Sequence, residues 1–151
     1  MGLSDLFKDS NTNGVVELSK DDVSSENLKK MLDGTKYEDS ASIDDDGDLL
    51  IQYDSINYFA IVNSESNYIK FVTAWEKSDS VNENRIARIM NKWNNDKVFT
   101  RACADGSNIE LDYFLTCEGG INKANFTDTL NWLFAIADSF NSFLKDEDAI
   151  D

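Results

Sequence analysis

The residues best suited to chemistry are four aspartates around one glycine, in the stretch Asp44-Asp45-Asp46-Gly47-Asp48. Clustered carboxylates are the ligands that calcium prefers in proteins. An EF-hand loop has oxygen ligands at positions 1, 3 and 5, glycine at position 6 and a bidentate glutamate at position 12. With Gly47 at position 6, Tyr53 occupies position 12 and the glutamate is missing. These residues therefore exclude an EF-hand, and weak surface calcium binding remains only as a lesser alternative to a sharp turn.

A hairpin turn accounts for the same residues more fully. If residues 45–47 form a three-residue loop, Gly47 takes the left-handed position that ends a type I turn. Ile43 then faces Leu49, so apolar side chains meet on one side of the hairpin, and the pairing continues with Ala41 opposite Ile51. The pattern favours a solvated hairpin tip.

The second candidate is the stretch CEGGINKANF, residues 117–126, which sets two glycines before a predicted helix start. Backbone N–H groups at such a start can bind an anion. The stretch lacks both GxGxxG and GxxxxGK[ST], so a structural turn is the favoured interpretation. Cys117 could be a reactive thiol beside this helix, but a buried small residue is the better expectation.

The sequence supports no catalytic mechanism. It contains no histidine, which removes the commonest general base and a common catalytic metal ligand. It also lacks a GxSxG motif and a Ser-x-x-Lys motif. We expect a non-enzymatic protein with no catalytic residues, no metal and no cofactor, and keep an enzyme or a calcium-binding protein as lesser alternatives.

Composition indicates one acidic globular domain. The 151 residues are 41% hydrophobic, with 29 acidic and 14 basic side chains and a net charge of −15. Nucleic acids and anionic membranes need clustered Lys and Arg, so neither is an expected partner. A basic or amphipathic protein partner is favoured, although many cytosolic bacterial proteins are simply acidic. No apolar run reaches the ~18 residues of a membrane span, and the first residues lack a secretory pattern, so we expect a cytoplasmic protein.

The expected domain covers residues 22–145. Residues 1–21 are predicted to be a loosely ordered N-terminal arm with one possible short strand, and residues 146–151 a flexible acidic tail. A first helix begins after Ser24, a good N-cap, and ends near Gly34. Residues 37–76 read as an antiparallel meander, rich in β-branched and aromatic residues, with a polar break at Asp54-Ser55.

A second helix is predicted over about residues 81–94, capped by Ser80 or Asn82, and a second hairpin follows it. A two-residue turn at Asp105-Gly106 predicts three facing pairs and one ion pair across the hairpin. They are Ala102 with Ile109, Thr100 with Leu111, Val98 with Tyr113, and Arg101 with Glu110. This register keeps Cys103 and Cys117 far apart, so we expect no disulfide between them and assign no role to either.

The last helix is predicted over residues 123–144, with Asn122 as its N-cap. Its apolar sector spans about 200°, roughly twice a minimal core-facing stripe. Either the helix lies deep between the sheet and the first helix, or it makes a second apolar contact with a twin subunit or a partner. The candidate contact residues on the last two helices are Ile86, Met90, Trp93, Trp132, Ile136 and Phe143.

The predicted order is α-βββ(β)-α-ββ-α, which indicates an α+β fold with helices packed on one side of an antiparallel sheet. Several segments resemble the YbjN family of bacterial sensory-transduction regulators. They are the helix end at Asn91 and Asn94, the following Phe99, an Asp-Gly hairpin, and Glu-Gly-Gly-Ile before a long aromatic helix. The upstream stretches IDDDGDLLIQYDSINYFAIV and YIKFVTAW are similar to that family's meander. The resemblance covers about residues 24–144.

The resemblance implies a fold like that of the type III secretion chaperones, which are small, acidic, dimeric α+β proteins. It implies a homodimer and a protein-binding role, and it brings no catalytic residues. We therefore expect a cytoplasmic regulatory protein that binds a partner polypeptide. The alternative is a type III secretion chaperone for a secreted effector.

Overall fold

The computed structural model describes residues 14–63, 65 and 67–151 of the chain. Its centre is a six-stranded sheet in the order β2-β3-β4-β5-β7-β6, in which every neighbouring pair is antiparallel. A separate two-stranded pair joins β1 to β8. In chain order the elements are β1 (Glu17–Leu18), η2 (Lys20–Asp22), α1 (Ser25–Met31), η3 (Glu38–Ser40), β2 (Ala41–Ile43), β3 (Leu49–Tyr53), β4 (Ile56–Val62), β5 (Tyr68–Glu76), α2 (Glu83–Asp96), β6 (Arg101–Asp105), β7 (Asn108–Thr116), β8 (Ile121–Asn122) and α3 (Lys123–Asp146).

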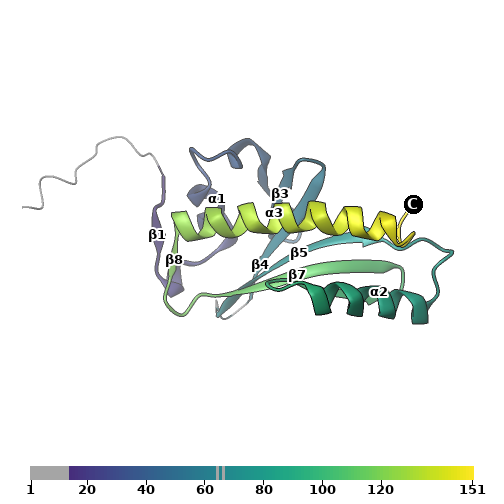
Figure 1. Ribbon diagram of the computed structural model, residues 1–151. Coiled ribbons are helices and arrows are strands. Elements are labelled where there is room, and N and C mark those ends of the chain that lie inside the picture. The colour runs from purple at the N-terminus through teal and green to yellow at the C-terminus, as the bar shows by residue number, and fades with distance from the viewer. Residues whose placement is uncertain (1–13, 64, 66) are drawn as a thin grey trace, which may run out of the picture.

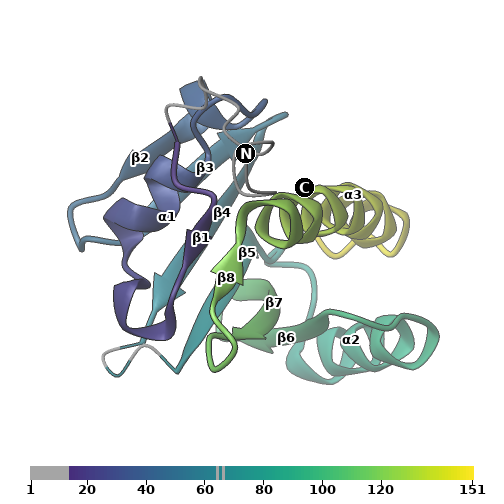
Figure 2. The same cartoon turned by 90° about the vertical axis from the view of Figure 1, so that its left-hand side faces the viewer.

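The three helices lie on one side of the sheet, and α3 runs along its length (Figures 1 and 2). Alternation along the strands explains this arrangement, because successive side chains point to opposite faces. On the helix side, Ile51, Phe71 and Leu111 are fully buried. Tyr58 donates a hydrogen bond from its hydroxyl to the Leu133 carbonyl at 3.1 Å, which ties α3 to the sheet. The predicted α+β fold with helices on one side is confirmed.

All three helices begin at side-chain caps. The Ser24 hydroxyl accepts a hydrogen bond from an N–H in the first turn of α1, as predicted. Asn82 is the cap of α2, and Asn122 caps α3. Each cap satisfies a backbone donor that the first turn leaves without a helical partner.

The first hairpin has the predicted register, with Ile43 opposite Leu49. Gly47 has a φ of 86°, the left-handed conformation that its place in the turn requires. The Asp44 carboxylate accepts hydrogen bonds from the N–H groups of Asp46 at 3.0 Å and Asp48 at 2.8 Å. This acid therefore holds the turn together.

The second hairpin differs from the predicted register. Ala102 pairs with Leu111, where Ile109 was expected, and Arg101 lies opposite Asp112, where Glu110 was expected. The turn is centred on Gly106 and Ser107, one residue later than predicted. Gly106 has a φ of 59°, so it is the residue that reverses the chain. Thr100 and Val98 precede β6, so their two predicted pairings do not form.

The described part of the expected N-terminal arm is attached to the domain; its first 13 residues lie outside the described ones. Leu18 is 7% exposed, and β1 pairs with β8. The Val16 carbonyl accepts a hydrogen bond from the Lys123 N–H at 2.8 Å. This segment is held on the domain by a few backbone hydrogen bonds and one buried leucine. Composition alone does not reveal such contacts.

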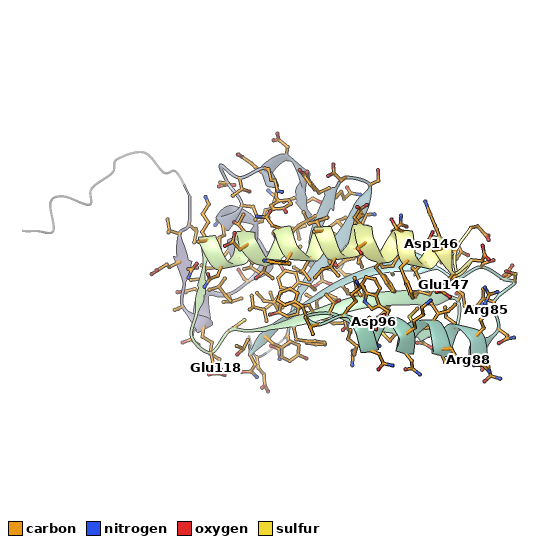
Figure 3. The ribbon with its side chains drawn as sticks, viewed as in Figure 1. Arg85, Arg88, Asp96, Glu118, Asp146 and Glu147 are labelled. Atoms are coloured by element: carbon orange, nitrogen blue, oxygen red, sulfur yellow. The ribbon has the colours of Figure 1, made fainter. Side chains whose placement is uncertain are left out.

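The expected C-terminal tail folds back onto the domain. Asp148 has a φ of 53°, and the next N–H, from Ala149, bonds to the Leu144 carbonyl at 2.8 Å. This is a Schellman motif, which turns the chain back over the helix end. Ala149 is fully buried, and Arg85 donates to the Glu147 carbonyl at 2.7 Å (Figure 3). The acidic composition of this segment suggested a flexible tail and gave no indication that it packs on the domain.

Candidate protein-binding surfaces

The three contact residues predicted on α2 lie mainly in the core. Ile86, Met90 and Trp93 are 5%, 4% and 3% exposed. The ring of Trp93 packs against that of Phe140 on α3, with centroids 4.7 Å apart. The apolar stripe of α2 faces its own sheet and α3, so most of its area is already covered within the monomer.

The three residues predicted on α3 divide between core and surface. Phe143 is half-buried, and its ring lies 5.2 Å from that of Trp93. Ile136 is also half-buried. Trp132 is 64% exposed, so it is the one predicted contact residue with a largely free side chain. The wide apolar sector of α3 is therefore mostly a helix buried on two sides, with an exposed remainder at Trp132.

Trp132 belongs to an exposed surface that we call the Phe99 cluster, formed by the rings of Phe99, Tyr113 and Trp132. The Phe99 and Tyr113 rings stack with centroids 4.3 Å apart, and the Phe99 and Trp132 centroids are 6.4 Å apart. Val98 is 86% exposed and Phe99 is 43% exposed. The cluster joins the link after α2, the middle of α3 and a strand of the sheet.

The backbone at Phe99 is strained. Its φ of 86° is one that bulky side chains rarely adopt. Such a conformation costs of order 1–3 kcal/mol and persists only when the surroundings enforce it. Here the strain keeps a phenyl ring on Tyr113 at the surface. Sequence reasoning missed Val98 and Phe99, because it treated both as strand residues paired across the second hairpin.

A groove runs between α2 and the edge of the sheet at β6. It has a volume of about 420 Å³, and Met90 and Ala104 contribute to its lining. The side chain of Asn94 reaches the strand edge there. Its amide donates to the Ala102 carbonyl at 2.9 Å, and its oxygen accepts from the Ala102 N–H at 2.8 Å. Asn94 thus completes the hydrogen bonds of one edge residue, a role that the sequence did not reveal.

The opposite face of the sheet carries no helix of the described chain (Figure 2). A buried carboxylate, Asp112, lies on this face at 2% exposure, paired with Arg101 at 2.5 Å. That pairing raises the pKa of the Arg101 guanidinium. Two exposed aromatic residues, Tyr68 and Phe114, pack edge to face nearby, with centroids 5.5 Å apart.

The described residues offer little for catalysis. No group of three or more His, Cys, Asp or Glu side chains in residues 14–63, 65 and 67–151 could hold a metal ion. Both cysteines are free thiols, and burial raises the pKa of Cys103 and of Cys117, which lowers their thiolate fraction. Burial, with Asp44 and Asp46 beside it, also raises the pKa of the Asp48 carboxyl. None of the described helices is long and apolar enough to cross a membrane.

The structure thus defines an α+β domain with exposed apolar surfaces. The family model of YbjN, described as "Putative bacterial sensory transduction regulator", matches residues 24–145. The chain therefore belongs to the YbjN family. It is similar to the crystal structure of YbjN, "a putative transcription regulator from E. coli", with a TM-score of 0.62 and 16% identity over 73% of this chain and 82% of that one. At this identity the likeness concerns the fold alone. No curated protein matches the sequence.

Proposed function

We propose that this protein is a non-catalytic, cytoplasmic regulatory protein that acts as a homodimer and binds a partner polypeptide. The Phe99 cluster is the observation that carries the proposal. It places Trp132, at 64% exposure, beside Phe99, at 43% exposure, on one surface. Aromatic side chains of this kind are enriched at the centres of protein interfaces. The family description as a regulator supports the same class of function.

We assign the Phe99 cluster to contact with a second copy of the chain. Two molecules with a charge of −15 each repel one another, so their contact needs a surface without acids. All three side chains of the Phe99 cluster are uncharged. A two-fold axis through this surface would bring Trp132 of one copy onto the same cluster of the other, and would cover the strained Phe99.

A photo-crosslinking amino acid at position 132 tests the assignment. We expect crosslinking of the purified protein to give a product of twice the chain mass. The matched control carries the same amino acid at Asp138, an exposed position on α3, and should give none. Equal yields from the two positions would rule out a dimer contact at Trp132.

The second candidate is a dedicated type III secretion chaperone. The chain has 29 acidic and 14 basic residues on a small α+β domain. This favours the chaperone function, because the type III secretion chaperones that the fold resembles are themselves small, acidic α+β proteins. A neighbouring gene for a secreted effector would support this function. A source organism without a type III secretion machine would eliminate it.

A further inference from the structure

The sheet face that carries no helix is apolar over four strands, β3, β4, β5 and β7 (Figure 2). A solvated sheet face is normally polar, because alternation directs every second side chain to water. Here Leu50 of β3 pairs with Phe59 of β4, and Phe59 pairs with Val72 of β5, so three apolar side chains form a continuous row. Alternation along β4, β5 and β7 adds three more apolar residues to the same face. We call this set the open-face patch: Leu50, Phe59, Ile61, Tyr68, Val72 and Phe114.

The open-face patch remains accessible in the monomer. Tyr68 and Phe114 are 40% and 45% exposed, and the other four side chains are half-buried. The hydrophobic core of the described chain includes none of the six, and neither do the half-buried residues that pack against that core. A contiguous exposed apolar surface of this kind marks an interaction site in soluble proteins.

At the β6 end of this face the charges are paired. Arg101 forms an ion pair with Asp112 at 2.5 Å, and Lys70 forms one with Glu110 at 3.9 Å. Lys70 and Arg101 are the two basic residues of the described strands. No cation of the described strands is therefore left to neutralise an acid elsewhere on the face.

At the β3 end of the face the carboxylates are unpaired. Asp48 is half-buried, and by alternation it lies on the same side of the sheet as Leu50. Burial, with Asp44 and Asp46 beside it, raises the pKa of the Asp48 carboxyl. None of the ion pairs within residues 14–63, 65 and 67–151 includes any of these three acids. A cation brought to this end of the patch would meet negative charge that the described chain does not neutralise.

We propose that the open-face patch binds an amphipathic helix of a partner protein, whose apolar side chains cover the patch and whose Lys or Arg side chains reach Asp46 and Asp48. The strands of this face already pair with one another, so only a segment that satisfies its own backbone groups can lie on it. A helix that crosses the strands advances about 5.4 Å per turn, and strands lie about 4.8 Å apart, so successive turns meet successive strands. This inference rests on the proposed partner-binding function and supplies the chemistry of the partner.

Charge complementarity selects this occupant over a second copy of the chain. A second copy has a net charge of −15. Its own sheet face offers only Lys70 and Arg101, and both already have acidic partners. A basic helix gains from the unpaired carboxylates at the β3 end, and its association is faster at low salt.

Fluorescence anisotropy with synthetic peptides tests the site on the full chain. The probe is a labelled Leu–Lys peptide of about 14 residues, long enough to cross four strands, with its Leu residues on one face of a helix. We expect it to bind about tenfold more tightly than a peptide of the same composition whose Leu residues are spread around the helix. The same helix with Glu in place of Lys should not bind. Equal affinity of the first two peptides, or no binding of the probe at millimolar concentration, would overturn the proposal.

Neutralisation of the unpaired acids separates this site from the general acidity of the chain. The Asp46→Asn, Asp48→Asn double variant keeps the turn-holding Asp44 and should weaken binding of the probe about fivefold. The matched control, Asp128→Asn with Asp138→Asn, makes the same charge change at exposed positions of α3, on the other side of the sheet, and should leave the affinity within about twofold. The same loss in both double variants would show non-specific attraction and overturn the assignment.

One aromatic substitution on each exposed surface keeps this site apart from the dimer contact. Phe114→Ser should weaken binding of the probe about tenfold and leave the protein dimeric. Trp132→Ser, a change of the same type at an exposed residue of α3, should lose the dimer and still bind the probe within about twofold of the wild-type affinity. Unchanged affinity in Phe114→Ser would exclude the open-face patch as the site. A wild type that dimerises without binding the probe would overturn this inference alone, whereas a monomeric wild type that binds it would overturn only the dimer.

Discussion

At the scale of single residues, the acids of this chain serve the fold. Asp44 begins an aspartate-rich stretch that suggests a cation site, yet its carboxylate accepts two backbone hydrogen bonds within the turn. Asp112 is buried at 2% exposure and satisfied by Arg101. Neither role is visible in composition, because both depend on which backbone or side-chain donors the fold brings within about 3 Å.

The clearest residue-scale prediction concerns alkaline unfolding. Tyr37 is fully buried, donates its hydroxyl to Asn131 at 2.8 Å, and has its pKa raised by burial to about 12. The ordinary value is 10.0, so only the unfolded chain ionises between pH 10 and 12. This contribution to stability is complete below pH 10 and is lost as the pH rises toward 12. The loss is of order 2 kcal/mol.

Urea unfolding of the wild type and Tyr37→Phe at pH 8 and pH 11.5 measures this contribution. At pH 8 the variant should be less stable by about 1 kcal/mol, because it loses the hydrogen bond to Asn131. By pH 11.5 the wild type has lost about 2 kcal/mol that the variant keeps, because phenylalanine has no proton to lose. The order should therefore reverse, with the variant the more stable by about 1 kcal/mol. Burial also raises the pKa of Tyr58, so both proteins keep some alkaline sensitivity. An unchanged difference at the two pH values would contradict the role of Tyr37.

At the scale of elements, the helix starts and the first hairpin could be predicted, because each is determined by residues close together in the sequence. Hydroxyl and amide caps located the helix starts, and the glycine at position 47 placed the first hairpin. The register predicted for the second hairpin is wrong because both Asp105-Gly106 and Gly106-Ser107 can form a tight turn. The observed register differs from the predicted one by a slip that keeps Ala102 and Leu111 on the same face, so apolar patterning cannot distinguish the two. Packing of residues 14–21 and of the segment after α3 depends on partners distant in the sequence, and was missed for that reason.

The turn between β3 and β4 offers a direct gain in stability. Asp54 and Ser55 have φ values of 47° and 64°, the left-handed pair of a type I′ turn. Asn-Gly suits such a turn far better, so Asp54→Asn with Ser55→Gly should stabilise the protein by about 1 kcal/mol in urea unfolding. Ser42→Gly, an exposed strand position, is the control and should destabilise by a similar amount. Equal destabilisation by both changes would show that the turn is not strained.

The cap that α2 places on β6 can be tested by removing one side chain. Asn94→Ala deletes the two hydrogen bonds to Ala102 and should cost about 1–2 kcal/mol of unfolding free energy. Asn91→Ala lies one helical turn earlier at an exposed position and should change stability by less than about 0.5 kcal/mol. Amide exchange at Ala102 should also accelerate in the Asn94 variant alone. If the two variants behave alike, the edge does not depend on Asn94.

At the scale of the whole molecule, the candidate site was only partly predictable. Helical periodicity identifies an apolar stripe, and the stripe of a core-facing helix is identical in pattern to that of an interface. Ile86, Met90 and Trp93 therefore looked available until the fold placed β6 and α3 against them. Trp132 stood out through the excess width of its helix face. No sequence pattern indicates that Phe99 is exposed, because its exposure results from a positive φ that cannot be predicted from the neighbouring residue types.

The homodimer is the prediction that belongs to this scale. Light scattering of the purified protein at micromolar concentration should give twice the 17.0 kDa chain mass. Trp132→Ser should shift the mass to that of one chain without lowering the unfolding temperature of the monomer, since this side chain is 64% exposed. Asp138→Ser, at another exposed α3 position, should remain dimeric.

Raised salt should strengthen the wild-type dimer, because screening weakens the repulsion between two chains of charge −15. A single-chain mass for the wild type at every salt concentration would refute the dimer, and a dimeric Trp132→Ser would move its contact away from the Phe99 cluster.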